Sequence, residues 1–87
     1  MIYVYVLRCV DGSLYTGITQ NLDERLKQHN RKRVSYTRDK LPVLIIHQEL
    51  KTSRKEAAKL ERYIKNKGAA KYLIQNFAAL HKLYVFL

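Results

Sequence analysis

The eighteen residues from Met1 to Ile18, MIYVYVLRCVDGSLYTGI, decide the fold of this chain. Two short runs rich in β-branched and aromatic residues flank Asp11-Gly12, and this pattern predicts a β-hairpin. The second run ends in Tyr15-Thr16-Gly17, where the glycine lets another group approach the backbone closely. The hairpin therefore supplies two strands of a sheet and a place where something can lie against one of them.

The length of the hairpin loop decides which side chains share a face of the sheet. A two-residue loop would put Tyr3 and Tyr15 on opposite faces. A three-residue loop from Val10 to Gly12, with the glycine in the left-handed conformation, pairs Tyr5 with Gly17 and separates the side chains more cleanly. One face is then almost wholly apolar and holds Ile2, Val4, Val6, Leu14 and Ile18. The other face gathers the three tyrosines beside Gly17, so we assign the first face to the core and the second to a site.

The length and charge of the chain narrow its class. Eighty-seven residues predict one small domain that spans residues 1–87. Seventeen Lys and Arg against seven Asp and Glu give a formal net charge of +10. An excess of this size is an electrostatic footprint for phosphate backbones, although a basic domain that docks on acidic proteins has the same balance.

The sequence also bears on the compartment. No apolar run approaches the ~20 residues that span a bilayer, and the N-terminus enters a strand pattern at once, without the regions of a signal peptide. Cys9 is the only cysteine, which excludes an internal disulfide framework and a multi-cysteine zinc site. These features predict a cytoplasmic protein without membrane contact.

A first helix is predicted from Asn21 to His29. Asn21 is a good N-cap, and Glu24 occupies the capping-box position three residues later. Arg25 and His29 are four residues apart, so they lie one above the other on a single face, next to the stripe of leucines that packs inward. A helix that turns an arginine and a histidine toward its own buried edge is unusual, and both become candidate functional residues.

The segment from Asn30 to Lys40 is predicted to be a loop. Its basic residues are Arg31, Lys32, Arg33, Arg38 and Lys40, and they surround Tyr36. Basic side chains around an aromatic ring suit a surface that grips a nucleic-acid strand. A solvated, mobile loop would have the same composition.

The remaining elements complete an α+β fold. The apolar run from Leu41 to His47 predicts a strand covered on both faces. A helix from Thr52 to Lys67 follows, and a third helix is expected from Ala69 to about Leu80. The tail from 81 to 87 could add an edge strand, extend the helix or form a dimer contact. The order β-β-α-β-α-α predicts a three-stranded, mainly antiparallel sheet flanked by helices.

Glu61 falls among the apolar positions of the second helix. It lies four residues after Ala57 and three before Ile64, both in the buried stripe. An ionised carboxylate is costly there unless it is paired or bound to a metal. The alternative is a position at the edge of the stripe, paired with a neighbouring Lys or Arg, and the spacing alone favours this alternative.

Together these residues resemble the GIY-YIG nuclease family, in particular its small stand-alone domains. The resemblance extends from Met1 to roughly Phe77. The first family motif matches Met1-Ile2-Tyr3 and the second matches Tyr15-Thr16-Gly17, with Met1 in place of the first glycine and Thr16 in place of the isoleucine. The family's catalytic arginine matches Arg25, the frequent histidine one turn later matches His29, and the metal-binding glutamate matches Glu61.

The resemblance implies an endonuclease that hydrolyses phosphodiester bonds with one divalent ion, Mg²⁺ or Mn²⁺. Glu61 would supply one hard oxygen ligand to the metal, and Arg25 would stabilise charge on the phosphate in the transition state. Tyr3 is the choice for positioning or deprotonating the attacking water, and Tyr15 for orienting phosphate or water. His29 would accept a proton or contact the phosphate, whereas Tyr5 is assigned to packing.

The expected partner is nucleic acid, DNA more than RNA. Candidate contacts to the strand are Gly17, Arg31, Arg33, Tyr36, Arg38 and Lys65. The short basic loop offers little surface for reading bases, so we expect structure-selective or weakly selective cutting, as in DNA repair or recombination. The alternatives are a non-catalytic nucleic-acid-binding domain of the same fold and a basic protein-interaction module.

Overall fold

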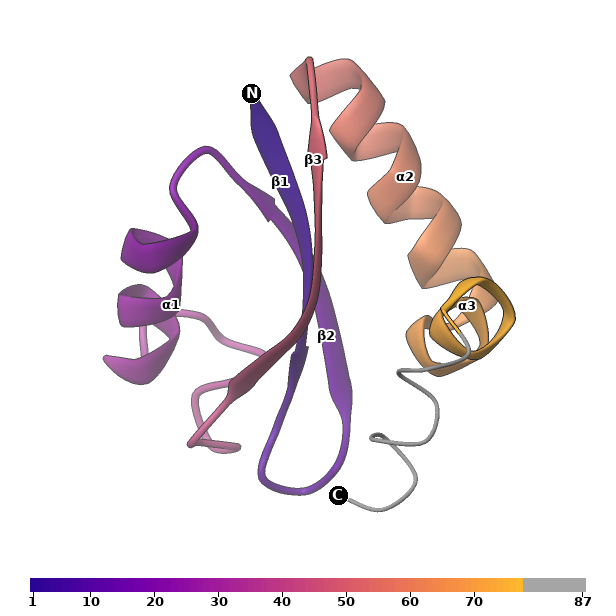
Figure 1. Ribbon diagram of the computed structural model, residues 1–87. Coiled ribbons are helices and arrows are strands. Elements are labelled where there is room, and N and C mark those ends of the chain that lie inside the picture. The colour runs from indigo at the N-terminus through magenta and orange to yellow at the C-terminus, as the bar shows by residue number, and fades with distance from the viewer. Residues whose placement is uncertain (78–87) are drawn as a thin grey trace.

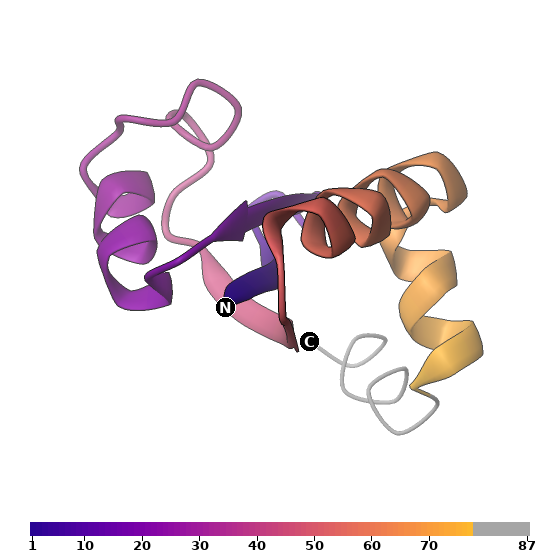
Figure 2. The same ribbon diagram turned by 90° about the horizontal axis from the view of Figure 1, so that it is seen from above.

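Three strands form one antiparallel sheet, and helices cover both of its faces. Strands β1 (Ile2–Arg8), β2 (Leu14–Thr19) and β3 (Leu44–Lys51) are ordered β2-β1-β3. Helix α1 (Leu22–Asn30) lies on one face, and helices α2 (Arg54–Lys67) and α3 (Ala69–Asn76) lie on the other (Figure 1, Figure 2). The α+β class and the order β-β-α-β-α-α confirm the predicted fold.

The computed structural model describes residues 1–77. Within that range no helix is long and apolar enough to cross a membrane. The predicted tail at 81–87 and the predicted end of the third helix lie outside the described residues. The assignment of residues 1–87 to one domain therefore stays a prediction.

The hairpin has the predicted three-residue loop. The Cys9 N–H donates to the Ser13 carbonyl at 2.8 Å, and the Gly12 N–H donates to the Cys9 carbonyl at 2.9 Å. Gly12 adopts a φ of 86°, in the left-handed region that favours glycine. Tyr5 consequently lies opposite Gly17, as the register analysis predicted.

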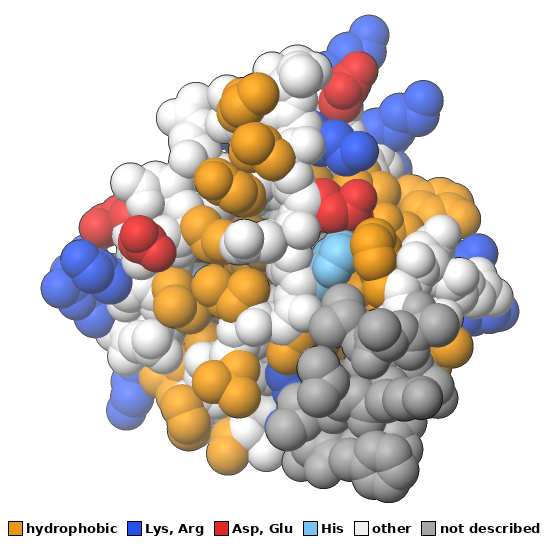
Figure 3. Space-filling model, in the orientation of Figure 1, with side chains coloured by type: hydrophobic (Ala, Val, Ile, Leu, Met, Phe, Trp, Pro, Cys, Tyr) orange, Lys and Arg blue, Asp and Glu red, His pale blue; other side chains and the backbone are white. Residues whose placement is uncertain are grey.

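Strand β3 differs from its prediction. It begins at Leu44 rather than Leu41, and it is an edge strand, with Leu44 56% and Leu50 46% exposed. Figure 3 shows hydrophobic side chains running along the side of the molecule where β3 lies in front. The apolar run predicted the strand too early, because Leu41 and Val43 belong to the loop before β3 and pack there against the second hydrophobic cluster. The strand with both faces covered is β1, at the centre of the sheet.

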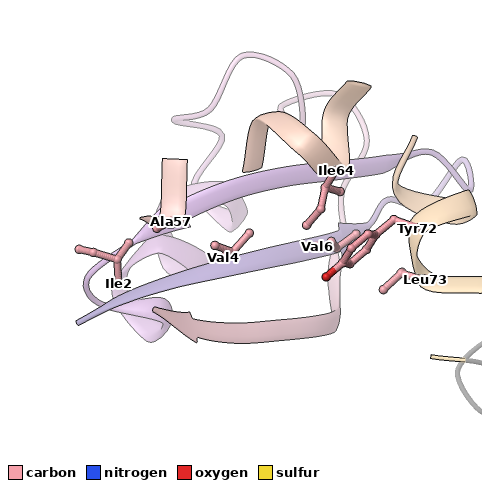
Figure 4. Close-up of a cluster of buried hydrophobic side chains, with 7 residues drawn as sticks. All are labelled: Ile2, Val4, Val6, Ala57, Ile64, Tyr72 and Leu73. Atoms are coloured by element: carbon pink, nitrogen blue, oxygen red, sulfur yellow. The ribbon is translucent and has the colours of Figure 1, made fainter. Parts of the chain in front are cut away.

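The main core lies between the sheet and helices α2 and α3. Its buried members come from β1, α2 and α3 (Figure 4) and are Ile2, Val4, Val6, Ala57, Ile64, Tyr72 and Leu73. Helix α2 is capped at its N-terminus by Ser53, because the Glu56 N–H donates to the Ser53 hydroxyl at 3.2 Å. On α3, Tyr72 is buried whereas Ile74 is 40% exposed.

The opposite face of the sheet carries a second hydrophobic cluster. Its buried members are Tyr5, Leu7, Cys9 and Val43, and Leu22 and Leu26 of α1 pack against them. The face that the sequence assigned to a site is therefore also a core. Side chains on this face can be held rigidly, because packing and hydrogen bonds both restrain them.

Candidate active site

Tyr5 is the centre of a buried polar cluster between β1 and α1. Its hydroxyl accepts a hydrogen bond from Arg25 Nε at 3.2 Å and lies 3.0 Å from His29 Nε2. The side chain is only 1% exposed. Burial raises the pKa of Tyr5 to about 12, against the opposing effect of the hydrogen bond from Arg25. Tyr5 is therefore a protonated phenol at neutral pH.

Gly17 creates the room that Tyr5 occupies. A Cβ atom built on Gly17 would lie 2.6 Å from the Tyr5 hydroxyl oxygen and 2.7 Å from Tyr5 Cζ. The close approach expected at this glycine is therefore made by the Tyr5 ring. Gly17 is itself buried, because the Tyr5 ring lies against it on this face.

Gly17→Ala tests this packing. The added methyl group collides with a ring that two hydrogen bonds hold in place, so we expect the free energy of unfolding to fall by ~1–3 kcal/mol. Urea denaturation measures the change. In a Tyr5→Leu background the same substitution should cost clearly less, because the colliding phenol is gone. Equal costs in the two backgrounds would show that the collision does not exist.

His29 lies on α1 with its ring fully buried, at 0% exposure. Its Nδ1 lies 2.7 Å from the Thr37 hydroxyl oxygen. Burial, reinforced by the charge of Arg25, lowers the pKa of His29 to about 4. The ring is consequently neutral at pH 7. Both ring nitrogens of His29 already face protein hydroxyls, so proton acceptance is favoured over phosphate contact as the role of this ring.

The low pKa of His29 makes stability depend on pH. The unfolded chain takes up a proton near pH 6.5, whereas the folded chain does so only near pH 4, so stability is lost as the pH falls through this window. Between pH 7 and pH 4.5 the wild type should lose about 2 kcal/mol more than His29→Gln. Urea unfolding at the two pH values measures the difference. Identical pH dependence in both proteins would contradict the assignment.

Arg25 is held at two of its nitrogens. Nε donates to Tyr5, and Nη1 donates to Gln28 Oε1 at 2.8 Å. The hydrogen bond to Tyr5 raises the pKa of Arg25 above its usual value, with a smaller contribution from Tyr15. A guanidinium has five N–H donors, and the bonds to Tyr5 and Gln28 engage two of them. The half-buried group is therefore fixed in place and can still bind an anion.

Tyr15 and Tyr36 connect the buried cluster to the surface. The Tyr15 ring lies 5.0 Å from the His29 ring and 5.5 Å from the Tyr36 ring, centroid to centroid. Tyr36 is 46% exposed, and the Lys40 ammonium lies 3.9 Å from its ring centroid. The structure thus brings Tyr36, a candidate strand contact, to the same place as Tyr15.

Glu61 lies at the edge of the buried stripe of α2. Its Oε2 is 3.3 Å from Lys65 Nζ, and its side chain is 23% exposed. The alternative that the spacing favoured, an edge position paired with a neighbouring lysine, is confirmed. Glu61 is therefore not an isolated buried charge, and its carboxylate has partial access to solvent.

The face of α2 that carries Glu61 runs along the outer edge of β2. Arg54, Glu61 and Lys65 share this face, because they are spaced by seven and four residues. Arg54 lines one hollow together with Ile18, Thr19, Arg25 and Gln28. Lys65 lines another together with Leu14, Tyr15, Thr16 and Tyr36. Helices α1 and α2 thus flank the same strand edge from opposite sides, with Arg25 on one side and Glu61 on the other.

A divalent ion on the α2 side of this edge would have Glu61 as its carboxylate ligand. Within residues 1–77 no group of three or more His, Cys, Asp and Glu side chains could hold a metal. Mg²⁺ accepts this situation, because it is commonly bound by one or two carboxylates together with waters and substrate phosphates. The partly exposed Glu61 fits such a role, with Lys65 moving aside.

Tyr3 is not part of the cluster around Tyr5. It is half-buried near the start of β1, where it pairs with Thr19 and Leu50, and it lines a hollow beside the start of α1. Two residues along a strand span roughly 7 Å, so Tyr3 cannot take the place of Tyr5. Tyr5, which the sequence assigned to packing, therefore occupies the place beside Arg25 and His29 that was expected of Tyr3.

The basic residues of the loop lie on the surface. Arg31, Arg33 and Arg38 are exposed, and within residues 1–77 their side chains form no hydrogen bond to the residues described above. Sequence reasoning missed Tyr5 and Thr37. The signal for Tyr5 was present, because the predicted register already set it opposite Gly17. Thr37 gave no signal, since its contact with His29 depends on how the loop folds back.

Comparison with known proteins gives a family match and several relatives. The model of the GIY-YIG catalytic domain matches residues 1–73. A UPF0213 protein of Desulfotalea psychrophila is 45% identical over 65 residues, which cover 72% of this chain and 59% of that protein. A UPF0213 protein of Bacillus licheniformis is 48% identical over 64 residues, covering 72% and 66%. The chain thus spans less than two thirds of the length of these two relatives.

A solved structure is also similar to this chain. The solution NMR structure of a UPF0213 protein from Bacillus halodurans is 40% identical to it, covers 76% of this chain and 72% of its own, and superimposes with a TM-score of 0.49.

Proposed function

The chain belongs to the GIY-YIG catalytic-domain family, and we propose that it is a metal-dependent endonuclease that hydrolyses phosphodiester bonds in nucleic acid, with DNA as its substrate. The observation that carries the proposal is the arrangement along β2. Arg25, fixed by Tyr5 and Gln28, borders one side of this strand edge, and the face of α2 with Glu61 borders the other. A strand lying along this edge would meet both.

Arg25 would bind the scissile phosphate. Its unused N–H donors form a planar fork that matches two phosphate oxygens. As the phosphorus gains its fifth oxygen, negative charge grows on those oxygens, and a donor held in place beforehand stabilises it most. The bonds to Tyr5 and Gln28 supply that fixed position, and Tyr15 orients the phosphate or water from the neighbouring strand.

Tyr5 and His29 would handle the proton of the attacking water. A water O–H bond would break and its proton pass to the Tyr5 oxygen, while the phenolic proton passes to His29 Nε2. The water oxygen bonds to phosphorus, and the P–O bond to the leaving oxygen breaks, with that oxygen taking up a proton from solvent. His29 can accept this proton because its low pKa keeps it neutral at pH 7. Tyr5, with a pKa near 12, acts through this exchange and not as a standing phenolate.

Glu61 would hold the divalent ion, Mg²⁺ or Mn²⁺. When bound, such an ion polarises the phosphate and stabilises the leaving oxygen as a Lewis acid. Lys65, now paired with Glu61, would turn to a phosphate of the strand. The net charge of +10 is suited to binding such a strand.

The substrate is proposed to be recognised by its structure. A small domain with a short exposed basic segment has little surface for base contacts, so branched or flapped DNA of the kind met in repair and recombination is the expected target. The test is incubation with labelled single-stranded, duplex, flapped and branched DNA, and with matched RNA, in Mg²⁺, Mn²⁺ or EDTA. Metal-dependent cutting of at least one DNA supports the proposal.

The other two function classes predict different results from the same panel. A non-catalytic binding domain binds the oligonucleotides and yields no product with any metal. A protein-interaction module loses its affinity for nucleic acid at physiological salt. Specific phosphate contacts on a duplex instead give a salt dependence with a slope of about −0.9 per contact.

A further inference from the structure

Thr37 is the one fully buried polar residue of the segment between α1 and β3, at 0% exposure. Its hydroxyl oxygen lies 2.7 Å from His29 Nδ1, and the hydroxyl faces the Val34 carbonyl at 3.5 Å. The backbone at Thr37 is also held by a hydrogen bond, because the Lys40 N–H donates to the Thr37 carbonyl at 2.9 Å. A loop residue held in this way can fix the state of the histidine that it contacts.

One placement of protons satisfies every bond in the chain that starts at Arg25. Arg25 has only donors, so the Tyr5 oxygen accepts from Nε, and the phenolic proton is left to point at His29 Nε2. A neutral imidazole with Nε2 as acceptor carries its proton on Nδ1. That proton is donated to Thr37, whose own hydroxyl proton is directed to Val34.

The opposite tautomer of His29, with the proton on Nε2, does not fit this arrangement of hydrogen bonds. If His29 carried its proton on Nε2, both Arg25 and His29 would donate to Tyr5, and the phenolic proton would have to turn away from His29. The Thr37 hydroxyl would also have to turn from the Val34 carbonyl to Nδ1. A buried polar group left without a partner costs about 1–3 kcal/mol. The tautomer therefore depends on whether Nδ1 has an acceptor, and within residues 1–77 that acceptor is Thr37.

We propose that Thr37 is a positioning residue that holds His29 in the Nδ1–H tautomer, and thereby keeps Nε2 open to accept the proton of Tyr5. Its effect on catalysis rests on the proposed nuclease function, whereas its effect on the tautomer does not. Nothing in the sequence pattern or the family match assigns this role to Thr37.

The experiment records the ring nitrogens of His29 by ¹⁵N NMR on the full chain at pH 7, where the ring is neutral. His29→Gln identifies the signals by their loss. The wild type should show a protonated, pyrrole-type Nδ1 and an unprotonated, pyridine-type Nε2. In Thr37→Val, which keeps the shape and removes the hydroxyl, the Nδ1–H form should no longer dominate. Thr37→Ser should restore the wild-type signals.

Cleavage of the best substrate gives the second readout. Thr37→Val should lower kcat by ~10²-fold with KM unchanged, at the lower end of what general acid–base catalysis contributes, and Thr37→Ser should recover it. A protonated Nε2 in the wild type overturns the proposal, and so does a Thr37→Val protein with unchanged tautomer and rate. If no substrate is cut but the tautomer responds as expected, the proposed nuclease function fails while the role of Thr37 stands.

Discussion

Arg25→Lys should lower the rate of phosphodiester cleavage at saturating metal by at least ~10²-fold, the loss seen when one fixed transition-state donor is removed. Lysine keeps the positive charge and loses the planar fork that binds two oxygens at once. It also cannot reproduce the bonds that Arg25 forms through Nε to Tyr5 and through Nη1 to Gln28. The new ammonium would be neither fixed nor bidentate.

The fold should survive this substitution. Arg25 is half-buried, so the lost hydrogen bonds should cost about 1 kcal/mol, which lowers the thermal midpoint of a chain this size by ~4–8 °C. Arg62→Lys, on the exposed part of α2, is the matched control and should leave both the rate and the midpoint unchanged. The proposal is wrong if Arg25→Lys cleaves at the wild-type rate.

Glu61→Gln should abolish metal-dependent cleavage, with a loss of at least ~10²-fold that higher Mg²⁺ does not reverse. The amide keeps the shape of the side chain and removes the charge that a hard cation needs. Stability should change little, because the pair between Glu61 and Lys65 is a surface i,i+4 contact worth ~0.3–0.5 kcal/mol. Cleavage rates across a Mg²⁺ and Mn²⁺ titration give the measurement.

Glu56→Gln is the matched control for this experiment. Glu56 lies in the first turn of the same helix, is exposed, and occupies a capping position where glutamine is equally acceptable. Its substitution should leave the metal dependence as in the wild type. If both variants lose activity equally, the effect comes from the charge of α2 in general, and Glu61 has no special role.

The sequence predicted the fold well where local chemistry decides it. The hairpin register followed from Gly12, and the start of α1 followed from its cap at Asn21. Strand β3 was placed too early because a continuous apolar run does not show whether it packs as strand or as loop. Its edge position follows from the sheet order, which no local pattern contains.

The sequence singled out several residues of the candidate site, but it did not predict how they are arranged in space. Arg25 and His29 stood out because polar side chains on a buried helix edge need partners. Which tyrosine meets them depends on where α1 crosses the sheet, and that crossing places it over Tyr5 and not over Tyr3. Thr37 could not be found, because a loop residue reveals its partner only once the loop is folded.

The sheet has two outer strands, β2 and β3, and a further strand could be added beside only one of them without covering the candidate site. Any additional strand paired with β2 would fill the edge that Arg25 and the Glu61 face of α2 border, and would close the site. Strand β3 carries no such restriction, because among residues 1–77 no strand pairs with its outer edge. A fusion partner or an enlarged sheet in an engineered version should therefore be attached beside β3, where it can extend the molecule without obstructing chemistry at the other margin.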